Sequence, residues 1–257
     1  MQALILAAGY ATRLYPLTQT CAKPLLPIGD RPLIDHIAQR IVTLDGLDRL
    51  HVVANDRFHG DFVQWATGWQ GRVPVSVYND GTFDNADRRG AIGDAEWVID
   101  QAEIDDDLLI VAGDNLFDFD MRALRAFQLE HGTSIVTYHF PDASLIPNYS
   151  TAEVDERHRV TSFVEKPAQP TTDLIGICCY LLSRADVPRV REYLADGNNP
   201  DAPGYFIAWL HQQVPVHAFE FDGLWYDIGD LRSLTEADNA LRARAGMPKR
   251  DAYELEL

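Results

Sequence analysis

The chain has 257 residues, of which 46% are hydrophobic, and its formal net charge at pH 7 is -17. This acidic balance argues against a nucleic-acid partner, because such binding depends on Lys and Arg side chains that release counterions. No segment approaches the roughly 20 apolar residues of a membrane span, and no basic region precedes the short apolar run at the N-terminus. We therefore expect a cytoplasmic protein without membrane contact.

Apolar, β-rich segments alternate with helical patterns through the first half of the chain. Strands are expected at residues 3–7, 50–54, 73–78 and 108–113, and helices at residues 33–44 and 91–101. The first of these helices is indicated by Leu33, Ile34, Ile37, Ile41 and Leu44, which recur at helical spacing. Uninterrupted apolar strands separated by helices are typical of a parallel sheet covered on both faces. This half is therefore predicted to be Rossmann-like α/β.

The second half is predicted to be richer in strand and less regular. After a helix at residues 121–131 come a strand within 133–140, a hairpin within 150–167, a strand at 177–182, a helix around 206–212, a strand within 214–221 and a last helix at about 231–244. No repeat or long linker interrupts the pattern. We expect one domain over residues 1–257 of α/β class, with a mostly parallel (mixed) sheet flanked by helices and a smaller β-rich part.

Lysine is scarce in this sequence, which makes two of its positions informative. The chain has three lysines, and Lys23 and Lys166 each close a short motif. Lys23 follows the loop AAGYATRLYPLT, in which small residues leave the first predicted strand and Arg13 precedes Lys23 by ten residues. Backbone N–H groups in such a turn can bind phosphate, and a compact ammonium group suits the same site. The Walker A and GxGxxG patterns are absent.

Two aspartates stand in matching sequence contexts. VAGDN ends an apolar strand with Asp114, at the edge where parallel sheets bind ligands, and WYDIGD offers Asp227 much later in the chain. Mg²⁺ prefers one or two carboxylates together with phosphate oxygens. A lone aspartate after a strand often only caps a helix. The pair is better explained by a metal site.

The motif FVEKP places Glu165 beside Lys166 and before Pro167. Because the residue before a proline is restricted, Lys166 is expected to be extended. If the strand continued, the two side chains would point to opposite sides. A surface ion pair is the simpler interpretation in a lysine-rich protein, but the scarcity of lysine favours a functional site.

The motifs above occur in the order found in the sugar-1-phosphate nucleotidylyltransferases, also called NDP-sugar pyrophosphorylases, and the chain resembles that family. The family's opening pattern LAGGxGTRLxPLTxxxxKPLLPI stands here as LAAGYATRLYPLTQTCAKPLLPI, and VAGDN, FVEKP and WYDIGD extend the resemblance over nearly the whole chain. It implies Mg²⁺-dependent condensation of a nucleoside triphosphate with a sugar 1-phosphate, giving an NDP-sugar and pyrophosphate. It also implies a nucleotide-binding half at about residues 1–120, a sugar-phosphate-binding half at about 121–245, and a tail at 246–257.

The resemblance assigns roles to individual residues. Arg13 would bind the β- and γ-phosphates, Lys23 the α-phosphate and Lys166 the sugar 1-phosphate. Asp114 and Asp227 would hold Mg²⁺ against the α-phosphate. The remaining expected contacts are Ala8, Gly9, Asn85, Gly90 and Asp114 for the nucleotide, and Ser150, Glu165 and Gly176 for the sugar phosphate. Ala8 and Gly9 are expected there because a base or ribose approaches backbone closely only where side chains are small.

Three positions depart from the family pattern. Ala11 replaces the second glycine of the opening loop, which is harmless only if its φ stays negative. Asn85 stands five residues before Gly90, where the family often has a longer glutamine in the base pocket. An ordinary loop, in which Asn and Gly are common, would show the same residues. Ser150 replaces the glycine that usually follows a tyrosine beside the sugar, so the acceptor pocket is expected to differ.

Two alternatives to this assignment stay open. The opening motif is shared with cytidylyltransferases that act on phosphocholine, a phosphonate or a cyclitol phosphate. A catalytically silent regulatory subunit is the other alternative, although such a protein should lack a metal aspartate or a phosphate lysine, and both pairs are present. The motifs do not choose the nucleobase or the acceptor, and they leave open whether the chain forms a homo-oligomer, as is frequent in the family.

Overall fold

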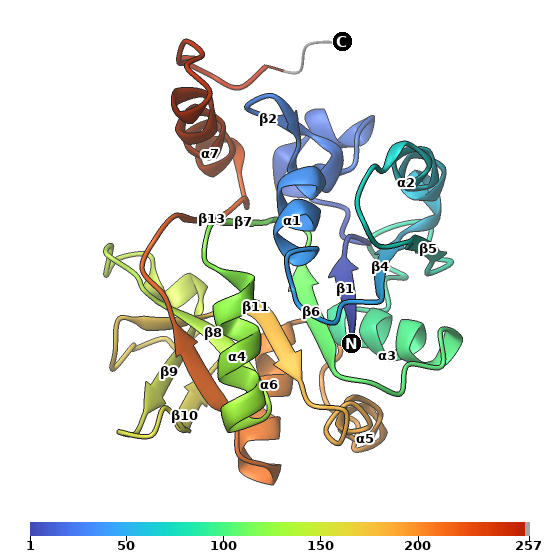
Figure 1. Ribbon diagram of the computed structural model, residues 1–257. Helices are drawn as coiled ribbons and strands as arrows, with labels where there is room; N and C mark the ends of the chain where they lie inside the picture. The colour runs from blue at the N-terminus through green and yellow to red at the C-terminus, as the bar shows by residue number, and fades with distance from the viewer. Residues whose placement is uncertain (255–257) are drawn as a thin grey trace.

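The structure is a computed structural model that describes residues 1–254. Within that range the central sheet has nine strands, and its main path runs β10-β9-β11-β6-β1-β4-β5. Four adjacent strands are parallel: β6 (Leu108–Ala112), β1 (Gln2–Leu6), β4 (Arg49–Ala54) and β5 (Val75–Asn79). Figure 1 shows this parallel part on one side of the molecule and the antiparallel strands on the other.

The antiparallel part begins at β11 (Leu174–Leu182), which pairs with β6 and joins the two halves of the sheet. β11 also pairs with β8 (Ser134–His139) and β9 (Ser150–Val154), and β9 forms the expected hairpin with β10 (Val160–Val164). β12 (His217–Glu220) runs parallel to β8 at the other margin. The mixed sheet predicted from the sequence is therefore present.

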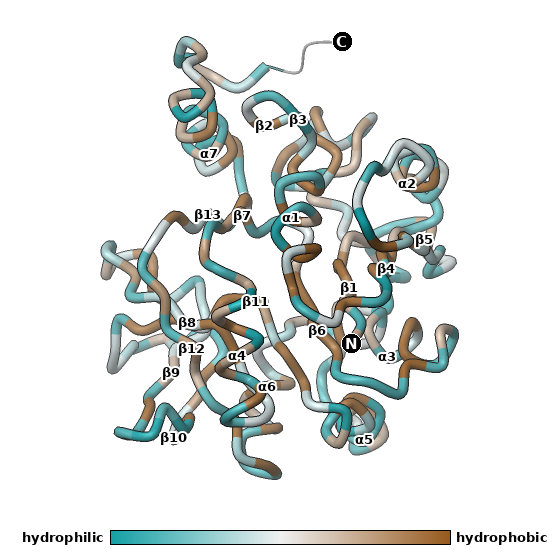
Figure 2. Tube along the Cα trace, in the orientation of Figure 1, coloured by the Kyte–Doolittle hydropathy of each residue, from teal (hydrophilic) through white to brown (hydrophobic). Residues whose placement is uncertain are grey.

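Helices cover both faces of this sheet. One hydrophobic core contains buried residues of α1 (Leu33–Ile41), α2 (Asp56–Gly68), α4 (Met121–His131) and α7 (Leu231–Arg244). The other contains buried residues of α3 (Ala91–Gln101), α5 (Arg189–Ala195) and α6 (Pro203–Gln213). In β1, Ala3 and Ile5 belong to the first core and Leu4 to the second, as expected from the alternation of side chains along a strand. Figure 2 shows hydrophobic residues along β1 and β4 in the interior.

Two helices were not predicted, and the reason lies in their sequences. Among the residues of α2, only Phe58 and Phe62 are buried, so the helical apolar period is nearly absent. α5 spans seven residues and buries Val190 and Tyr193. Such short or weakly periodic segments form helices because tertiary packing supports them. No helix within residues 1–254 combines the length and the apolar character needed to cross a membrane.

Short elements complete the fold around the carboxyl ends of the parallel strands. The opening loop contains three 3₁₀ turns, η1 (Thr12–Leu14), η2 (Leu17–Gln19) and η3 (Lys23–Leu25). β7 (Asn115–Phe117) pairs antiparallel with β13 (Trp225–Asp227), which joins the end of β6 to a segment far away in sequence. The hairpin β2 (Pro27–Ile28) and β3 (Arg31–Pro32), and η4 (Ile146–Asn148), complete the short elements.

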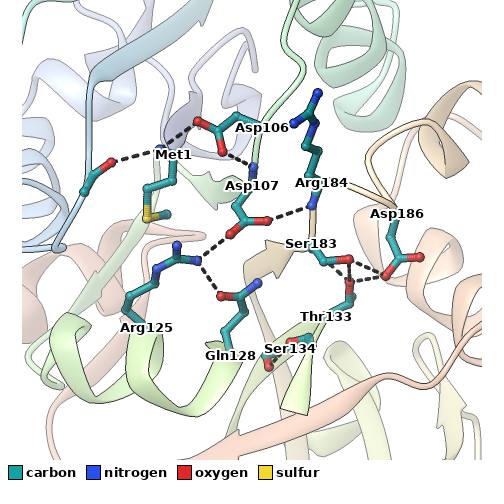
Figure 3. Close-up of polar contacts among 12 residues, drawn as sticks. Met1, Asp106, Asp107, Arg125, Gln128, Thr133, Ser134, Ser183, Arg184 and Asp186 are labelled. Atoms are coloured by element: carbon teal, nitrogen blue, oxygen red, sulfur yellow. Dashed lines mark hydrogen bonds and ion pairs between the residues drawn. The ribbon is translucent and has the colours of Figure 1, made fainter. Parts of the chain in front are cut away.

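A polar network fastens the opposite end of the sheet, where β6 begins and β11 ends (Figure 3). Asp107 accepts hydrogen bonds from the Arg184 backbone N–H at 2.7 Å and from Arg125 Nη1 of α4 at 2.6 Å. Nearby, the Ser183 N–H donates to Thr133 Oγ1 at 3.0 Å, which ties the end of β11 to the start of β8. The network holds the antiparallel strands of the sheet in position against its parallel strands.

Asp107→Asn is therefore expected to destabilise the fold by about 1–3 kcal/mol, because Arg125 loses a charged partner. The measurement is urea unfolding followed by circular dichroism. Asp105→Asn is the matched control, since Asp105 pairs with Arg184 in an exposed ion pair with side-chain exposures of 76% and 65%. It should leave the urea midpoint unchanged. Equal midpoints for the two variants would contradict a structural role for Asp107.

Candidate active site

A cavity of about 370 Å³ opens where β1 and β6 end. Its lining brings together ten of the residues that the sequence predicts: Ala8, Gly9, Lys23, Gly90, Asp114, Ser150, Glu165, Lys166, Gly176 and Asp227. They come from the loops after β1, β6 and β10, from the starts of α3 and β9, and from β11 and β13. The carboxyl ends of neighbouring parallel strands meet at one sheet edge, which explains why the first of these loops converge.

The two aspartates converge because β7 and β13 pair. Asp227 lies opposite Asn115 in this small sheet, and the Ile228 N–H donates to the backbone oxygen of Asp114 at 3.0 Å. Lys23 reaches the same place, where its Nζ atom donates to Asp114 Oδ2 at 2.7 Å and to the Ile228 carbonyl at 2.9 Å. A cation and two carboxylates that lie far apart in sequence thus share one end of the cavity.

The two carboxylates differ in their pKa. Burial tends to raise the pKa of Asp114, but the charge of the adjacent Lys23 ammonium and the hydrogen bonds from Lys23 and Asn115 together hold this pKa below its usual value. Burial and the neighbouring Asp114 charge raise the pKa of Asp227 to about 6. Two acidic groups that repel each other in a partly buried place form a set that a divalent cation would stabilise.

Lys166 has a different conformation from the one predicted. Its φ is +47°, in the left-handed region, and β10 ends at Val164, so Lys166 is not extended and does not continue the strand. The chain turns after β10, and this turn overrides the local preference set by Pro167. As a result Glu165 and Lys166 do not point to opposite sides. Both line the cavity, and Lys166 Nζ lies 3.7 Å from Glu165 Oε1.

Glu165 and Ser150 form a pair on the side of the cavity where β9 begins and β10 ends. The Ser150 hydroxyl donates to Glu165 Oε2, and the Glu165 side chain is 6% exposed. The first turn of α6 packs directly against them. A Cβ atom at Gly204 would clash with Glu165 Oε2 and Ser150 Oγ, so a larger residue there would displace this pair. Ser150 therefore occupies one of the two oxygens of Glu165, which the usual glycine would leave free.

Two predicted residues do not line the cavity. Arg13 is exposed in η1, and its guanidinium nitrogens lie 3.5 Å from the position that a Cβ atom on Gly229 would occupy. It is close enough to Asp227 to counteract the rise in the pKa of that group. Asn85 is exposed, and its carbonyl oxygen accepts a hydrogen bond from Arg88 Nη1 at 2.8 Å. Arg88, rather than Asn85, belongs to the lining.

A family model described as Nucleotidyl transferase matches residues 2–244. The chain belongs to the nucleotidyl transferase family. The match confirms the family that the four sequence motifs predict. It covers both halves of the mixed sheet and every residue assigned to the cavity above.

Curated relatives are similar over almost the whole of this chain. It is 26% identical over 254 residues to the UTP–glucose-1-phosphate uridylyltransferase of Synechocystis sp., an alignment that covers 95% of this chain and 64% of that protein. It is 25% identical over 264 residues to the mannose-1-phosphate guanyltransferase of Emericella nidulans, covering 96% and 69% of the two chains. The present chain thus spans less than two thirds of the uridylyltransferase.

Solved structures share the fold. A putative glucose-1-phosphate thymidylyltransferase from Bacillus anthracis, in complex with a sucrose, superposes with a TM-score of 0.81 at 22% identity, covering 94% of this chain and 95% of that one. UDP-glucose pyrophosphorylase complexed with UDP-glucose gives a TM-score of 0.79 at 18% identity, covering 95% and 98%. These comparisons confirm the α/β fold class predicted from the sequence.

The lining also contains residues that the sequence motifs do not reveal. Arg88 forms two hydrogen bonds with Asp201, at 2.9 and 2.8 Å, although the two residues are 113 positions apart. Ile177, Cys178 and Tyr180 line the cavity together with Gly176, and the pairing of β11 with β8 shifts its register between Ile177 and Tyr180. Simple alternation along β11 therefore does not identify these residues. No local sequence pattern predicts the contact between Arg88 and Asp201.

Ala11 has a positive φ. This is the backbone conformation that favours glycine, the residue that the family pattern has at this position. Its φ of +47° and ψ of +44° are left-handed, and its carbonyl accepts a hydrogen bond from Thr18 Oγ1 at 2.8 Å. The condition under which alanine would be harmless is therefore not met. The cost is about 1–2 kcal/mol of backbone strain.

Proposed function

We propose that this chain condenses a nucleoside triphosphate with a sugar 1-phosphate to give an NDP-sugar and pyrophosphate. The observation that carries the proposal is the convergence of Lys23, Lys166, Asp114 and Asp227 on one cavity. The reaction brings two anions together, and a site with ammonium groups on two sides and a pair of carboxylates suits that task. The similarity to a uridylyltransferase and a guanyltransferase supports this reaction class.

In this mechanism an oxygen of the sugar phosphate attacks the α-phosphorus of the triphosphate. The new P–O bond forms as the bond from the α-phosphorus to the β-phosphate oxygen breaks, and pyrophosphate leaves with that electron pair. The phosphate monoester is already an anion, so no side chain has to remove a proton. Lys166 would hold the attacking phosphate, Lys23 the α-phosphate and Arg13 the leaving pyrophosphate, and together they would align the reacting groups and screen their charges.

The residues present fit Mg²⁺. Asp114 and Asp227 would hold the ion, because their mutual repulsion and partial burial leave negative charge in need of a counterion. Bound there, Mg²⁺ would supply charge stabilisation to the phosphate oxygens. Lys23, which is 13% exposed and lies against Asp114, would keep the first carboxylate ionised for this purpose.

The decisive experiment is a pyrophosphate-release screen. Each common nucleoside triphosphate is paired with a panel of hexose 1-phosphates and with phosphocholine, in the presence of MgCl₂ or EDTA. Release with a hexose 1-phosphate that EDTA abolishes is the expected result. Release with phosphocholine alone would select the cytidylyltransferase alternative, which the Ser150–Glu165 contact favours because it alters the acceptor side. No release with any pair would leave the silent-subunit alternative.

The pKa of Asp227 gives the proposed site a pH dependence. Asp227 must be ionised to bind a cation, so apparent Mg²⁺ affinity and kcat/KM at low Mg²⁺ are expected to fall as the pH drops through about 6. The folding stability depends on pH in the opposite direction. Because this pKa lies above the ordinary aspartate value of 3.8, the contribution of Asp227 to stability falls as the pH rises from 3.8 to about 6.

Rates measured across that pH range at low and at saturating Mg²⁺ test this dependence. Saturating Mg²⁺ should move the acid limb to lower pH, because the cation competes with the proton. An acid limb at the same pH under both conditions would contradict the assignment to a metal-binding carboxylate.

A further inference from the structure

Asp94 is a buried carboxyl group in the wall of the cavity. It lies in the first turn of α3, close to Gly90 and Ala91, which line the same part of the cavity. Its exposure is 6%, and within residues 1–254 its Oδ1 atom has no hydrogen-bond partner. Asp80, a nearby buried aspartate, differs in this respect, since it accepts hydrogen bonds from the Thr82 N–H at 2.7 Å and from Thr82 Oγ1 at 2.8 Å.

Asp94 lies on the buried face of its helix, where an apolar residue is expected from packing. Ile92, Ala95 and Val98 of the same helix are fully buried in the second core. A buried polar group without a partner costs free energy, which an apolar side chain at that position would avoid. A ligand that reaches the carboxyl group through the small part of Asp94 exposed to the cavity would offset this cost.

The surroundings of Asp94 favour its protonated form, which can both donate and accept a hydrogen bond. Burial, with a smaller contribution from the Asp80 carboxylate, raises the pKa of Asp94 to about 8, against the opposing effect of Arg89. At neutral pH the carboxyl therefore retains its proton in most molecules and presents both a donor and an acceptor. Such a group pairs with a neutral, flat edge that carries N–H groups and acceptors side by side, as a nucleobase does.

The small residues that line the same cavity as Asp94 suit a base rather than the phosphates. Ala8, Gly9, Gly90 and Ala91 line the cavity and have small or no side chains, which leaves room for a planar ring. The ammonium groups suited to phosphates, Lys23 and Lys166, belong to other elements, η3 and the turn after β10. Asn85, which the resemblance placed in the base pocket, is exposed and does not line it.

We propose that Asp94 is the residue that determines nucleobase specificity, through a hydrogen bond between its carboxyl group and the pairing edge of the base. This proposal rests on the proposed nucleotidylyl transfer, and it names a contact that the sequence motifs do not contain. A site whose buried polar group pairs with one arrangement of donors and acceptors rejects bases that leave that group unpaired.

The test is nucleotide binding by calorimetry with the four common ribonucleoside triphosphates, without a sugar phosphate. Asp94→Ala should weaken binding of the preferred triphosphate by about tenfold or more, and that of the others by less, so that discrimination falls. Asp94→Asn presents a donor and an acceptor, as the protonated carboxyl does, so it should keep the preference for the same triphosphate. Asp100→Asn is the matched control, because Asp100 lies on the same helix, is exposed and does not line the cavity.

Two outcomes would overturn the proposal. One is that Asp94→Ala keeps the wild-type ranking of the four triphosphates with affinities within about twofold. The other is that Asp94→Ala is markedly less stable than wild type without nucleotide, since removal of an unpartnered buried group should leave stability equal or higher. Binding is measured without turnover, so it remains informative if the pyrophosphate-release screen is negative.

Discussion

Asp114→Asn is expected to lower Mg²⁺-dependent pyrophosphate release by about 10²–10³-fold, the scale of one lost charge-stabilising contact. The amide is nearly isosteric with the carboxylate but carries no charge, so it is a poor magnesium ligand. It also leaves the Lys23 ammonium, which is 13% exposed, without its anionic partner at 2.7 Å. Steady-state kinetics at several Mg²⁺ concentrations measure the effect.

The matched control for Asp114→Asn is Asp222→Asn. Asp222 is exposed, lies just before β13 and does not line the cavity, so the same change of charge there should leave turnover unchanged. Circular dichroism checks that each variant is folded. Because Asp114 and Asp227 would act on one ion, the double variant with Asp227→Asn should lose little more activity than either single variant. Metal-dependent turnover at the wild-type rate in Asp114→Asn would remove this carboxylate from the mechanism.

Lys166→Ala should impair use of the sugar phosphate more than binding of the triphosphate. We expect kcat/KM for the sugar 1-phosphate to fall about 10²–10³-fold, whereas triphosphate affinity stays close to that of wild type. The reason is that Lys166 comes from the turn after β10 and adjoins Glu165 and Ser150, on the acceptor side of the cavity. The measurements are initial rates with each substrate varied in turn and calorimetry with the triphosphate.

Lys249→Ala is the control for Lys166→Ala. It removes the third lysine of the chain, which is exposed near the end of the described residues and does not line the cavity. It should leave both substrates unaffected. Should Lys166→Ala instead weaken triphosphate binding and spare the sugar phosphate, Lys166 would have to be reassigned to the nucleotide.

Local patterns in the sequence predicted most of the sheet. The apolar runs that became β1, β4 and β6 are buried on both faces, and such runs mark interior strands whatever their neighbours are. The pattern was less exact where burial was incomplete. The strand expected at residues 73–78 spans Val75–Asn79, whose residues are all only partly buried. α2 was not predicted because few of its residues face the core.

The sequence alone determined which chemistry is available: scarce lysines after a small-residue loop and in FVEKP, an aspartate at the end of an apolar strand in VAGDN, and a second aspartate in WYDIGD. Only the tertiary structure decided how these groups meet. The β7–β13 pairing sets Asp227 beside Asp114, the turn after β10 brings Lys166 to the same side as Glu165, and α3 presents Asp94 to the cavity. These contacts join segments far apart in the chain, and no local period or propensity encodes which distant segments will pack together.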